Sequence, residues 1–578
     1  MALDVHRKAL EKKGHRKRNI EEEEILKKII TPDHPIDPFE LLGERSFNEP
    51  REIPEEEIGT PVQEFFRDTT VFLTGGTGFM GKMLVEKLLR SCPHIKHIYL
   101  LVRVKKGKSA HERIDDIFQD RLFKRLRYEV PKFYHKVSVI NGDIEQPGLG
   151  ISTEDREKLS EEVNIIFHGA ATVKFDEKLR IAVGINVLGT REVLKLAKSV
   201  KNLKVIMHVS TAYSFCPRPE VEEKFYSVPE KYEKVIEKVK LMSDDEIDCE
   251  TPKLIHDWPN TYTFTKALAE CLIQKESQGL PIGIFRPSVI VSTYREPVRG
   301  WIDNVYGPIG VIVGIGTGIL RVYEGNLDRN SCDMVPVDLV VNGLICAAQQ
   351  TADKYKHSSK IETDTPIYIF SSGIQNPITW RRILDYSEKH GMEWPTIRAV
   401  WYYSLTVTEN RRIYAILSFL LHTLPGYVLD FFAVLVGEKP MLTNIYQKLD
   451  NVRDILEYFK VRHWTFKNEN TQELWRSLSQ RDKELFFFDM SSISWEYFLK
   501  ALCLGLRVYL INDDIHTIPA ARKKWKRLYY AHVCLKCVLA LLHGFLGILL
   551  ALFLSIIVSM SHFSSRCTNF RPDVSIYV

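Results

Sequence analysis

One stretch of sequence decides the fold: Thr74-Gly75-Gly76-Thr77-Gly78-Phe79-Met80-Gly81. It follows a short apolar run at residues 71–73 and opens a segment with the apolar spacing of a helix. Glycines at these intervals let the backbone approach a pyrophosphate, and a helix N-terminus supplies unpaired N–H donors and the positive end of its dipole. The pattern predicts a dinucleotide-binding turn with these cofactor contacts: Thr74, Gly75, Thr77, Gly78, Phe79 and Gly81.

The same stretch also fits part of the phosphate-binding motif of nucleotide triphosphatases. Four residues separate Gly76 from Gly81, and Lys82 follows, as in that motif. Met83, however, occupies the position where a Ser or Thr must bind Mg²⁺. The missing hydroxyl excludes an ATPase of this class.

Further apolar runs follow the glycine-rich turn at regular intervals. They predict strands at residues 98–102, 137–140, 165–167, 205–209 and 282–285. Helical patterns lie between them, for example at residues 81–89 and 190–197. Strands that alternate with helices in this way predict an α/β fold of the Rossmann type, with a doubly wound parallel sheet.

Composition and pattern divide the chain into four parts. Residues 1–65 form a charged extension that we expect to be disordered, although its basic run could also be a nuclear signal. Residues 66–375 carry the strand–helix alternation, and residues 376–515 are predicted to form a helical C-terminal domain. Residues 522–578 contain a basic and aromatic belt followed by an apolar segment.

The apolar segment is long enough to be a membrane anchor. Residues 537–560 contain no formal charge, and at 1.5 Å per residue they can cross a hydrocarbon core of about 30 Å. The basic run at 522–527 and the pair Tyr529-Tyr530 precede it. The positive-inside tendency therefore predicts a single-pass protein whose catalytic domain faces the cytosol. A buried core helix is the alternative.

A second apolar and aromatic stretch covers residues 411–439. Pro425 and Gly426 interrupt it and Asp430 lies inside it, so each apolar half is too short to span a bilayer. We expect a helical hairpin that caps the active site, lines a tunnel for an acyl chain or dips into a membrane surface. A pair of core helices is the alternative.

Composition excludes several classes of protein. The formal net charge of +5 is small for 578 residues, which argues against a dedicated nucleic-acid binder. The ten cysteines show no disulfide spacing. Cys534 and Cys537 lack the second pair of ligands that a zinc site requires, so we expect free thiols and no metal site.

The end of the second strand indicates which dinucleotide binds. An NAD enzyme needs an acidic residue there for the ribose hydroxyls, but this chain has Arg103, with Lys105 and Lys106 close behind. A guanidinium suits the 2′-phosphate of NADPH, while a solvated basic loop is the alternative. Asp143, after the third strand, is expected near the adenine.

Tyr262 and Lys266 carry the predicted acid–base chemistry. Residues four apart lie on one face of a helix. A phenol with a pKa near 10 needs a neighbouring cation to act at neutral pH, and Lys266 can supply it while also holding the nicotinamide ribose. The hydroxyl pair Ser210-Thr211 ends a strand and completes the group.

These motifs together resemble the extended short-chain dehydrogenase/reductases and, among them, the fatty acyl-CoA reductases. The resemblance covers roughly residues 68–510. It rests on Thr74 to Gly81, His168 to Phe175, Asn186, His208 to Tyr213, Tyr262 to Glu270, Phe285 to Ser288 and Phe486 to Trp495. It implies that Thr211 orients the substrate carbonyl, that Tyr262 donates a proton and that Lys266 activates Tyr262.

The resemblance also implies a reaction. It is the NADPH-dependent reduction of a long-chain fatty acyl-CoA to a primary alcohol through a bound aldehyde, at the membrane of the endoplasmic reticulum or the peroxisome. A membrane-bound hydroxysteroid-type dehydrogenase and a catalytically inactive nucleotide-sensing scaffold are the alternatives.

Three further polar residues are expected to have structural roles. His168 is interpreted as a residue that caps a strand end, and Arg286 as one that packs at the rim of the cofactor cleft. Asp338 is expected to cap a helix at residues 339–350.

Overall fold

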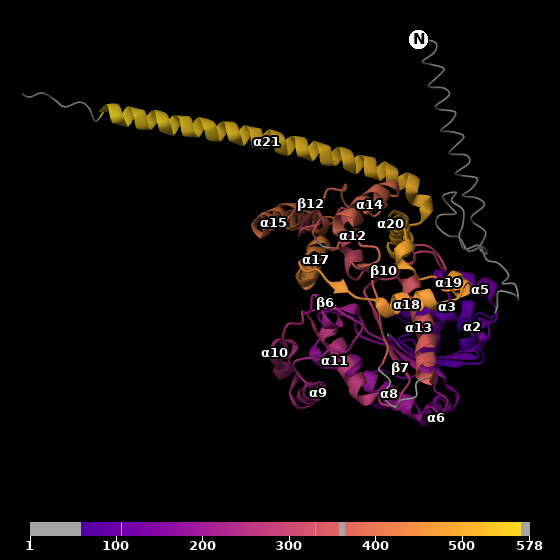
Figure 1. The fold of residues 1–578 in the computed structure, drawn as a ribbon. Coiled ribbons are helices and arrows are strands. Elements are labelled where there is room, and N and C mark those ends of the chain that lie inside the picture. The colour runs from indigo at the N-terminus through magenta and orange to yellow at the C-terminus, as the bar shows by residue number, and fades with distance from the viewer. Residues whose placement is uncertain (1–58, 106, 330, 358–364, 568–578) are drawn as a thin grey trace, which may run out of the picture.

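Seven parallel strands form the central sheet of the computed structural model, which describes residues 59–105, 107–329, 331–357 and 365–567 (Figure 1). The strands lie in the order β11-β7-β5-β4-β1-β2-β3. They are β1 Thr70–Thr74, β2 His97–Val102, β3 Val137–Asn141, β4 Ile165–His168, β5 Val205–Val209, β7 Ile282–Pro287 and β11 Ile367–Phe370. All six predicted strands are confirmed. The order reverses between β1 and β4, the switch point at which such sheets bind ligands.

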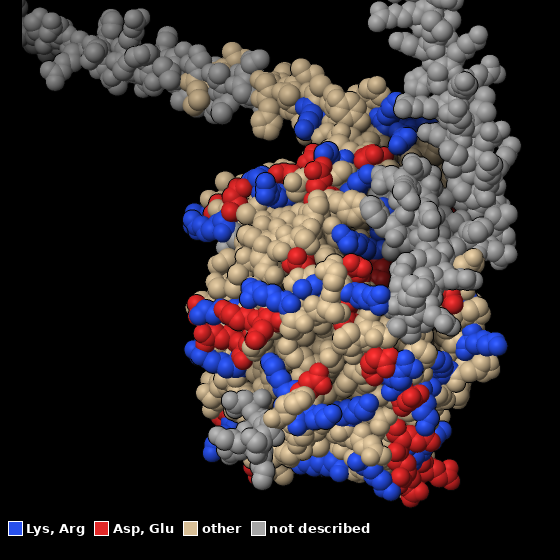
Figure 2. Space-filling model, turned by 45° about the vertical axis from the view of Figure 1, so that its right-hand side comes forward, with Lys and Arg blue, Asp and Glu red and all other residues tan. Residues whose placement is uncertain are grey.

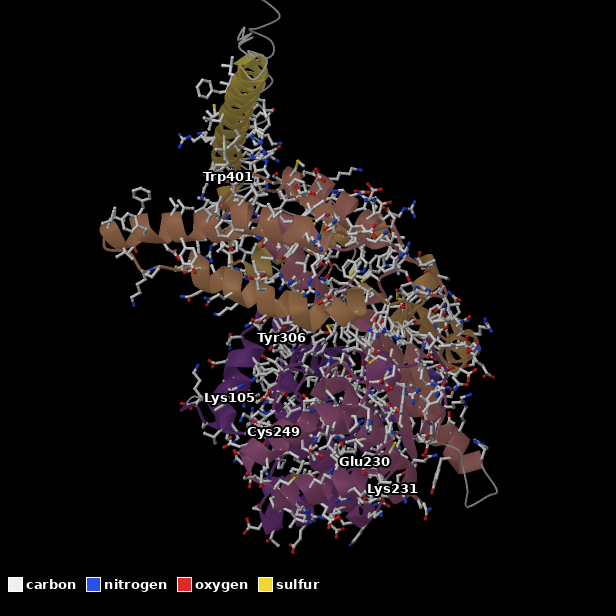
Figure 3. All side chains as sticks on the ribbon, turned by 90° about the vertical axis from the view of Figure 1, so that its left-hand side faces the viewer. Lys105, Glu230, Lys231, Cys249, Tyr306 and Trp401 are labelled. Atoms are coloured by element: carbon white, nitrogen blue, oxygen red, sulfur yellow. The ribbon has the colours of Figure 1, made fainter. Side chains whose placement is uncertain are left out.

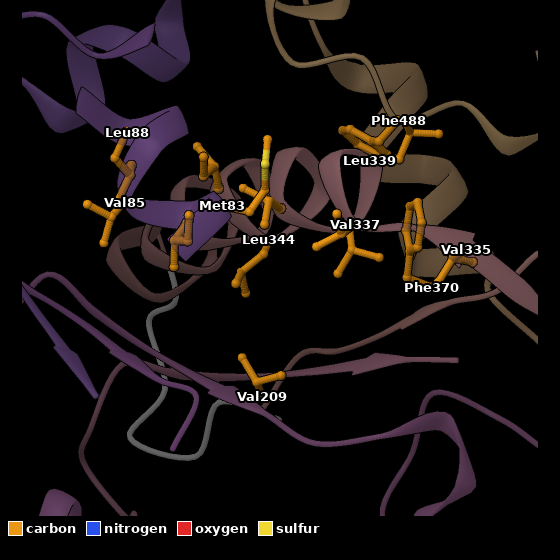
Figure 4. Packing of buried hydrophobic residues seen from close by; sticks show 14 of the residues in the cluster. Met83, Val85, Leu88, Val209, Val335, Val337, Leu339, Leu344, Phe370 and Phe488 are labelled. Atoms are coloured by element: carbon orange, nitrogen blue, oxygen red, sulfur yellow. The ribbon is translucent and has the colours of Figure 1, made fainter. Parts of the chain in front are cut away.

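Helices cover both faces of the sheet. Along β1, Val71 and Leu73 pack into one core and Phe72 into the other, because successive side chains of a strand point to opposite faces. The first core lies under α3 (Phe79–Ser91) and α13 (Val337–His357), as Figure 4 shows for the close packing of their apolar side chains. The second core lies under α8 (Gly189–Ser199) and α11 (Thr261–Glu276).

The chain after the sheet is mainly helical. Its elements are α14 (Trp380–Glu393), α15 (Arg411–Ser418), α16 (Leu424–Leu435), α17 (Leu442–Lys460), α18 (Glu469–Ser477), α19 (Gln480–Leu485), α20 (Trp495–Gly505) and α21 (Ile518–Cys567). This part contributes β13 (Thr465–Phe466), which pairs with β6 (Glu220–Val221), and β12 (Thr406–Thr408), which pairs with β9 (Val322–Glu324). The two parts of the chain are therefore joined by strand pairing as well as by helix packing.

The remaining elements connect the sheet to its surroundings. They are α2 (Pro61–Phe66), α4 (Ala110–Phe118), α5 (Lys124–Glu129), α6 (Thr153–Glu162), α7 (Leu179–Val183), α9 (Tyr232–Leu241), α10 (Asp244–Ile255), α12 (Pro308–Gly316), and a small sheet of β8 (Val289–Val291) with β10 (Met334–Pro336).

The folded part of the chain begins earlier than the predicted boundary at residue 65. Thr60 caps α2, and the side chains of Val62 and Phe66 are fully buried in the first core. A helix of six residues is too short to show an apolar period, so this boundary could not be read from the pattern. Residues 1–58 of the predicted extension lie outside the described residues.

The predicted break at Pro425-Gly426 is wrong. Helix continues from Arg411 to Leu435, because a π-helical turn at Phe419–Thr423 joins α15 to α16. Pro425 lies at the start of α16, where a missing N–H costs little. Gly426 is required because an added Cβ would lie 3.0 Å from the Tyr446 ring of α17. The hairpin that does form is made by this helix and α17.

A single helix, α21, contains both the basic belt and the predicted membrane anchor. It runs without interruption from Ile518 to Cys567. Figure 2 shows blue Lys and Arg side chains at the base of this helix and mostly tan atoms along its described part beyond. By length and composition, two segments could cross a membrane: Arg411–Leu435 and, where side chains are described, Ile515–Phe545.

Candidate active site

The glycine-rich turn packs so closely against neighbouring backbone that two of its positions have no space for a side chain. Gly75 has φ +81°, and a Cβ there would lie 2.7 Å from the backbone nitrogen of Ala170. A Cβ on Gly81 would lie 2.2 Å from the carbonyl oxygen of Gly75. Gly78 is the N-cap of α3 and provides no side chain to cap the helix, so the first N–H groups of α3 remain free to bind an anion.

The hydroxyl of Thr74 is engaged inside the protein. It lies 2.8 Å from Nδ1 of His168 and accepts the N–H of Ala170 at 3.2 Å. Nε2 of His168 lies 2.9 Å from the hydroxyl of Thr190, which itself donates to the carbonyl oxygen of Asn186. Burial lowers the pKa of His168 to about 3, so this ring is neutral and joins the ends of β1 and β4.

The two residues predicted to surround the adenosine end of the cofactor lie together. Nη1 of Arg103 is 3.4 Å from a carboxylate oxygen of Asp143, and the Arg103 side chain is 46% exposed. A surface pair at this distance is weak, so the guanidinium of Arg103 remains available to a phosphate.

Arg113, on α4, is a neighbour that the sequence analysis missed. It donates to the carbonyl oxygen of Arg103 at 2.5 Å and to the hydroxyl of Thr77 at 3.4 Å. Burial and the charge of Arg103 lower its pKa. The guanidinium of Arg113 therefore contacts both the dinucleotide turn, at Thr77, and the backbone of Arg103. Arg113 stands in a helical stretch ten residues after Arg103, and nothing in its local pattern points to this site.

The side chains of Phe79 and Lys82 contact Trp301 and Asp303, far along the chain. The Phe79 ring stacks on Trp301 with centroids 5.2 Å apart, and Lys82 forms an ion pair with Asp303 at 2.7 Å. The side chain of Phe79 thus supports the turn by packing. The ion pair of Lys82 agrees with the exclusion of the triphosphatase motif.

Tyr262 and Lys266 lie one turn apart on α11, as predicted. Asn260 caps this helix, and Nζ of Lys266 donates to the carbonyl oxygen of Val209 at 2.7 Å. That bond holds the lysine at the carboxyl end of β5. Burial lowers the pKa of Lys266 to about 8, against the opposing charge of Glu270.

Thr211 lies next to Tyr262. It follows β5, caps a short 3₁₀ turn and accepts the N–H of Tyr213 at 3.3 Å. Burial raises the pKa of Tyr262 to about 12, and a hydrogen bond with the Thr211 hydroxyl opposes that rise. The tyrosine is therefore protonated at neutral pH and can donate a proton. The three residues predicted to carry the chemistry are brought together.

Below this group lies a buried ion pair that the sequence analysis did not identify. Glu270, one turn after Lys266 on α11, pairs with Arg286 at 2.5 Å, and both side chains are 0% exposed. Glu270 also accepts the hydroxyl proton of Ser210 at 2.5 Å. Arg286 therefore lies in the core and not at the rim of the cofactor cleft.

Asp338 also has a different role from the one predicted. It lies inside α13, and its carboxylate accepts three backbone N–H groups, those of Tyr294, Arg295 and Glu296, at 2.8 to 3.1 Å. It fixes a distant loop instead of capping its own helix.

Aromatic side chains from two parts of the chain meet at Tyr262. Phe175 stacks on Tyr262 with centroids 5.8 Å apart, and Phe459 of α17 contacts Phe175 at 5.5 Å. Phe459 also contacts Tyr213 and Trp464. The end of α17 thus reaches the apolar side of the site.

A cavity that opens to solvent lies in the helical part. Its walls come from α12, α14, α20, the base of α21 and the residues after α14 and α20, and they include Trp394, Cys503 and Trp525. The expected tunnel would be lined by residues 411–436, whereas this cavity is lined by other helices.

Comparisons with known proteins agree with this arrangement. Two family models, both described as male sterility protein, match residues 73–344, as an NAD-binding domain, and residues 421–513. The chain is 44% identical to "Fatty acyl-CoA reductase wat" of Drosophila melanogaster over 473 residues, which are 82% of this chain and 90% of that protein. It is 38% identical to "Fatty acyl-CoA reductase 1" of Homo sapiens over 467 residues, 81% of this chain and 89% of that one.

A solved structure shares the fold. The reductase domain of a nonribosomal peptide synthetase from Mycobacterium tuberculosis aligns with a TM-score of 0.50 and 18% identity, covering 78% of this chain and 96% of that one. The sheet, the tyrosine–lysine helix and the helical C-terminal part are those of an extended short-chain dehydrogenase/reductase that binds a nicotinamide cofactor. With these identities over nearly the whole length of its relatives, the chain belongs to the fatty acyl-CoA reductase family.

Proposed function

We propose that this protein is an NADPH-dependent oxidoreductase that reduces a long-chain fatty acyl-CoA to a primary fatty alcohol and coenzyme A. The observation that carries the proposal is the group of Thr211, Tyr262 and Lys266 at the carboxyl end of β5, in a chain of this family. This edge of the sheet also carries the glycine-rich turn after β1.

The protein's own groups would act on the substrate carbonyl. Bound NADPH supplies the hydride. Tyr262 and Thr211 donate hydrogen bonds to the thioester oxygen, which gains negative charge only in the transition state. Tyr262 can do so because it is protonated at neutral pH. Its proton goes to the oxygen as the charge develops.

Two reductions complete the reaction. The first breaks the carbon–sulfur bond, releases coenzyme A as the thiol and leaves an aldehyde. The second adds another hydride and proton to the aldehyde to give the primary alcohol. Lys266 lies one turn from Tyr262, where its ammonium can hold the nicotinamide ribose and stabilise the tyrosinate left after proton transfer. Phe175 and Phe459 offer an apolar wall for the acyl chain beside the carbonyl.

The preference for NADPH rests on Arg103 and Arg113. Both guanidinium groups lie beside the turn after β1, near the end of β2. Arginine forms paired, charge-assisted hydrogen bonds with phosphate oxygens. Asp143 would lie near the adenine.

The domains that we propose are those predicted from the sequence, except that the first folded domain starts at residue 59. Residues 59–375 form the reductase domain and residues 376–515 the helical domain, while α21 anchors the protein in a membrane of the endoplasmic reticulum or peroxisome. The basic residues at the base of α21 support a cytosolic catalytic domain.

The test is a product analysis. Purified protein is incubated with NADPH and acyl-CoAs of increasing chain length, and lipid products are identified by mass spectrometry. Primary alcohols support the proposal. Oxidation or reduction of hydroxysteroids alone would favour a dehydrogenase of that class, and NADPH binding without turnover would favour a sensing scaffold.

A further inference from the structure

The helix Arg411–Leu435 is built with its polar side facing inward. Tyr414, Ser418 and His422, which are four residues apart, and Asp430, eight residues after His422, are each less than 10% exposed and face the protein. The N–H of Arg321 donates to Nε2 of His422 at 2.9 Å, and Asp430 accepts the N–H groups of Met441, Leu442 and Thr443 at the start of α17. The buried polar side chains of this helix therefore have partners inside the protein.

Its outward side is apolar. Thirteen large apolar side chains, each 44–77% exposed, cover it: Ile413, Ile416, Phe419, Leu420, Leu424, Tyr427, Val428, Leu429, Phe431, Phe432, Val434, Leu435 and Val436. Asp430 is the one formally charged residue between 413 and 437. A water-exposed helix has the opposite arrangement, and an exposed apolar patch of this extent marks a contact with protein or lipid.

The segment before this helix contacts the base of α21. Tyr402, nine residues before Arg411, contacts Trp525 and Tyr529 of α21, and the indole N–H of Trp401 donates to His532 at 3.1 Å. Figure 3 shows the hairpin of this helix and α17 projecting sideways from the body, at the level where α21 leaves it near Trp401. The helix that carries the exposed apolar side chains therefore lies level with the base of α21.

The helix cannot itself span a bilayer, although it is long enough. β12, before the helix, pairs with β9, and β13, after α17, pairs with β6, so the hairpin leaves the folded body and returns to it on the same side. Spanning would require α17 to cross as well, but α17 carries Lys448, Asp450 and Arg453. If the helix lies in the plane of the membrane surface, its apolar outer side contacts lipid while its polar inner side stays against the protein.

We propose that the helix Arg411–Leu435 lies in the lipid surface as a second, in-plane membrane element, and that α17 conducts the acyl chain from the bilayer to Tyr262. The two helices pack closely, with His422 stacked on Tyr446 at 5.1 Å. At its other end α17 carries Phe459, which contacts Phe175 and, through it, Tyr262. The proposed route of the acyl chain rests on the proposed function, whereas the proposed contact of the helix with lipid does not.

The lipid contact can be tested in the full-length protein. A photo-crosslinking p-benzoylphenylalanine replaces Phe432, or Tyr128 on α5 as the control, since both aromatic side chains are 57% exposed. In vesicles of phosphatidylcholine and phosphatidylserine (4:1), we expect cross-linking to labelled phosphatidylcholine at position 432 to exceed that at position 128 by about tenfold. Equal labelling, or cross-linking of position 432 to a second copy of the chain, would overturn the proposal.

The route of the substrate requires a second measurement in the same vesicles. Phe432→Asp should raise KM for a long-chain acyl-CoA severalfold and leave kcat/KM for a short, soluble acyl-CoA unchanged. Tyr128→Asp should change neither, and both variants should keep the wild-type Tm. Equal losses on both substrates would refute the route. If wild-type protein reduced no acyl-CoA, the proposed function would fail while the lipid cross-link could still be observed, so the two failures are distinguishable.

Discussion

Arg113 donates a hydrogen bond of 2.5 Å to the carbonyl oxygen of Arg103, and this bond brings two guanidinium groups to one side of the dinucleotide turn. Like charges repel, and the charge of Arg103 contributes to the lowered pKa of Arg113. An anion between the two side chains would relieve that repulsion. The pair therefore supports the proposed binding of NADPH, which carries a 2′-phosphate that NADH lacks.

The first prediction concerns this pair. Arg103→Ala and Arg113→Ala should each raise KM for NADPH far more than KM for NADH, because each variant loses charge-assisted hydrogen bonds worth roughly 1.5–3 kcal/mol. Steady-state kinetics with both cofactors provide the measurement. Equal increases in KM for NADPH and NADH would show that the two arginines do not bind the 2′-phosphate.

The second prediction concerns the proton donor. Tyr262→Phe removes one oxygen and keeps the ring that stacks on Phe175, so folding and NADPH binding should survive. Turnover should fall by about 10² or more, because the developing oxyanion loses its proton donor. Single-turnover oxidation of NADPH measures the chemical step. Turnover close to the wild-type rate would mean that another group supplies the proton.

The third prediction is a pH profile. Burial lowers the pKa of Lys266 to about 8, so its ammonium is present at pH 7 and is lost as the pH rises through that value. If the cation is required, kcat/KM should fall above about pH 8. His168, with a pKa of about 3, should add no transition between pH 5 and 7. In a folded Lys266→Arg variant the alkaline fall should move to higher pH, and an unmoved fall would assign it to another group.

The fourth prediction concerns stability. Glu270→Gln leaves the fully buried Arg286 without its charged partner, so the free energy of unfolding should fall by about 3–5 kcal/mol. The control is Glu496→Gln, because Glu496 pairs with Lys389 on the surface. Loss of that pair should cost less than about 1 kcal/mol. Thermal unfolding of both variants compares the two costs, and similar Tm values would contradict a strong buried pair.

The fifth prediction concerns topology. With basic residues at 522–527 just before the apolar part of α21, the catalytic domain should face the cytosol. Protease added to intact organelles should digest that domain, while a tag fused after Val578 should remain protected. A protected catalytic domain would invert the orientation and separate the enzyme from cytosolic NADPH.

Much of the fold could be predicted from the sequence because the relevant signals are local. Six of the seven strands of the central sheet appear as short apolar runs, and the glycine spacing places a turn between the first strand and its helix. The pair Tyr262 and Lys266 follows from helical spacing alone. β11 was missed, although its four residues form an apolar run bounded by Pro366 and by Ser371-Ser372-Gly373.

The membrane-facing helix shows where local signals mislead. Pro425, Gly426 and Asp430 are ordinarily signs of a break in a helix. Here Pro425 follows a π-helical turn, Gly426 admits the ring of Tyr446, and Asp430 caps the next helix. Each of these three residues fits its surroundings in the folded structure, and the local sequence does not show those surroundings.

The sequence by itself therefore determined the parallel sheet, the dinucleotide turn, the tyrosine–lysine helix and an apolar segment long enough to be an anchor. These features depend on residue spacing within one element. Only the tertiary structure decided that Arg113 meets Arg103, that Glu270 neutralises Arg286 and that Asp338 fixes the loop at residues 294–296. The physical reason is that each of these side chains contacts residues of another element, and chain folding, rather than local pattern, brings the two elements together.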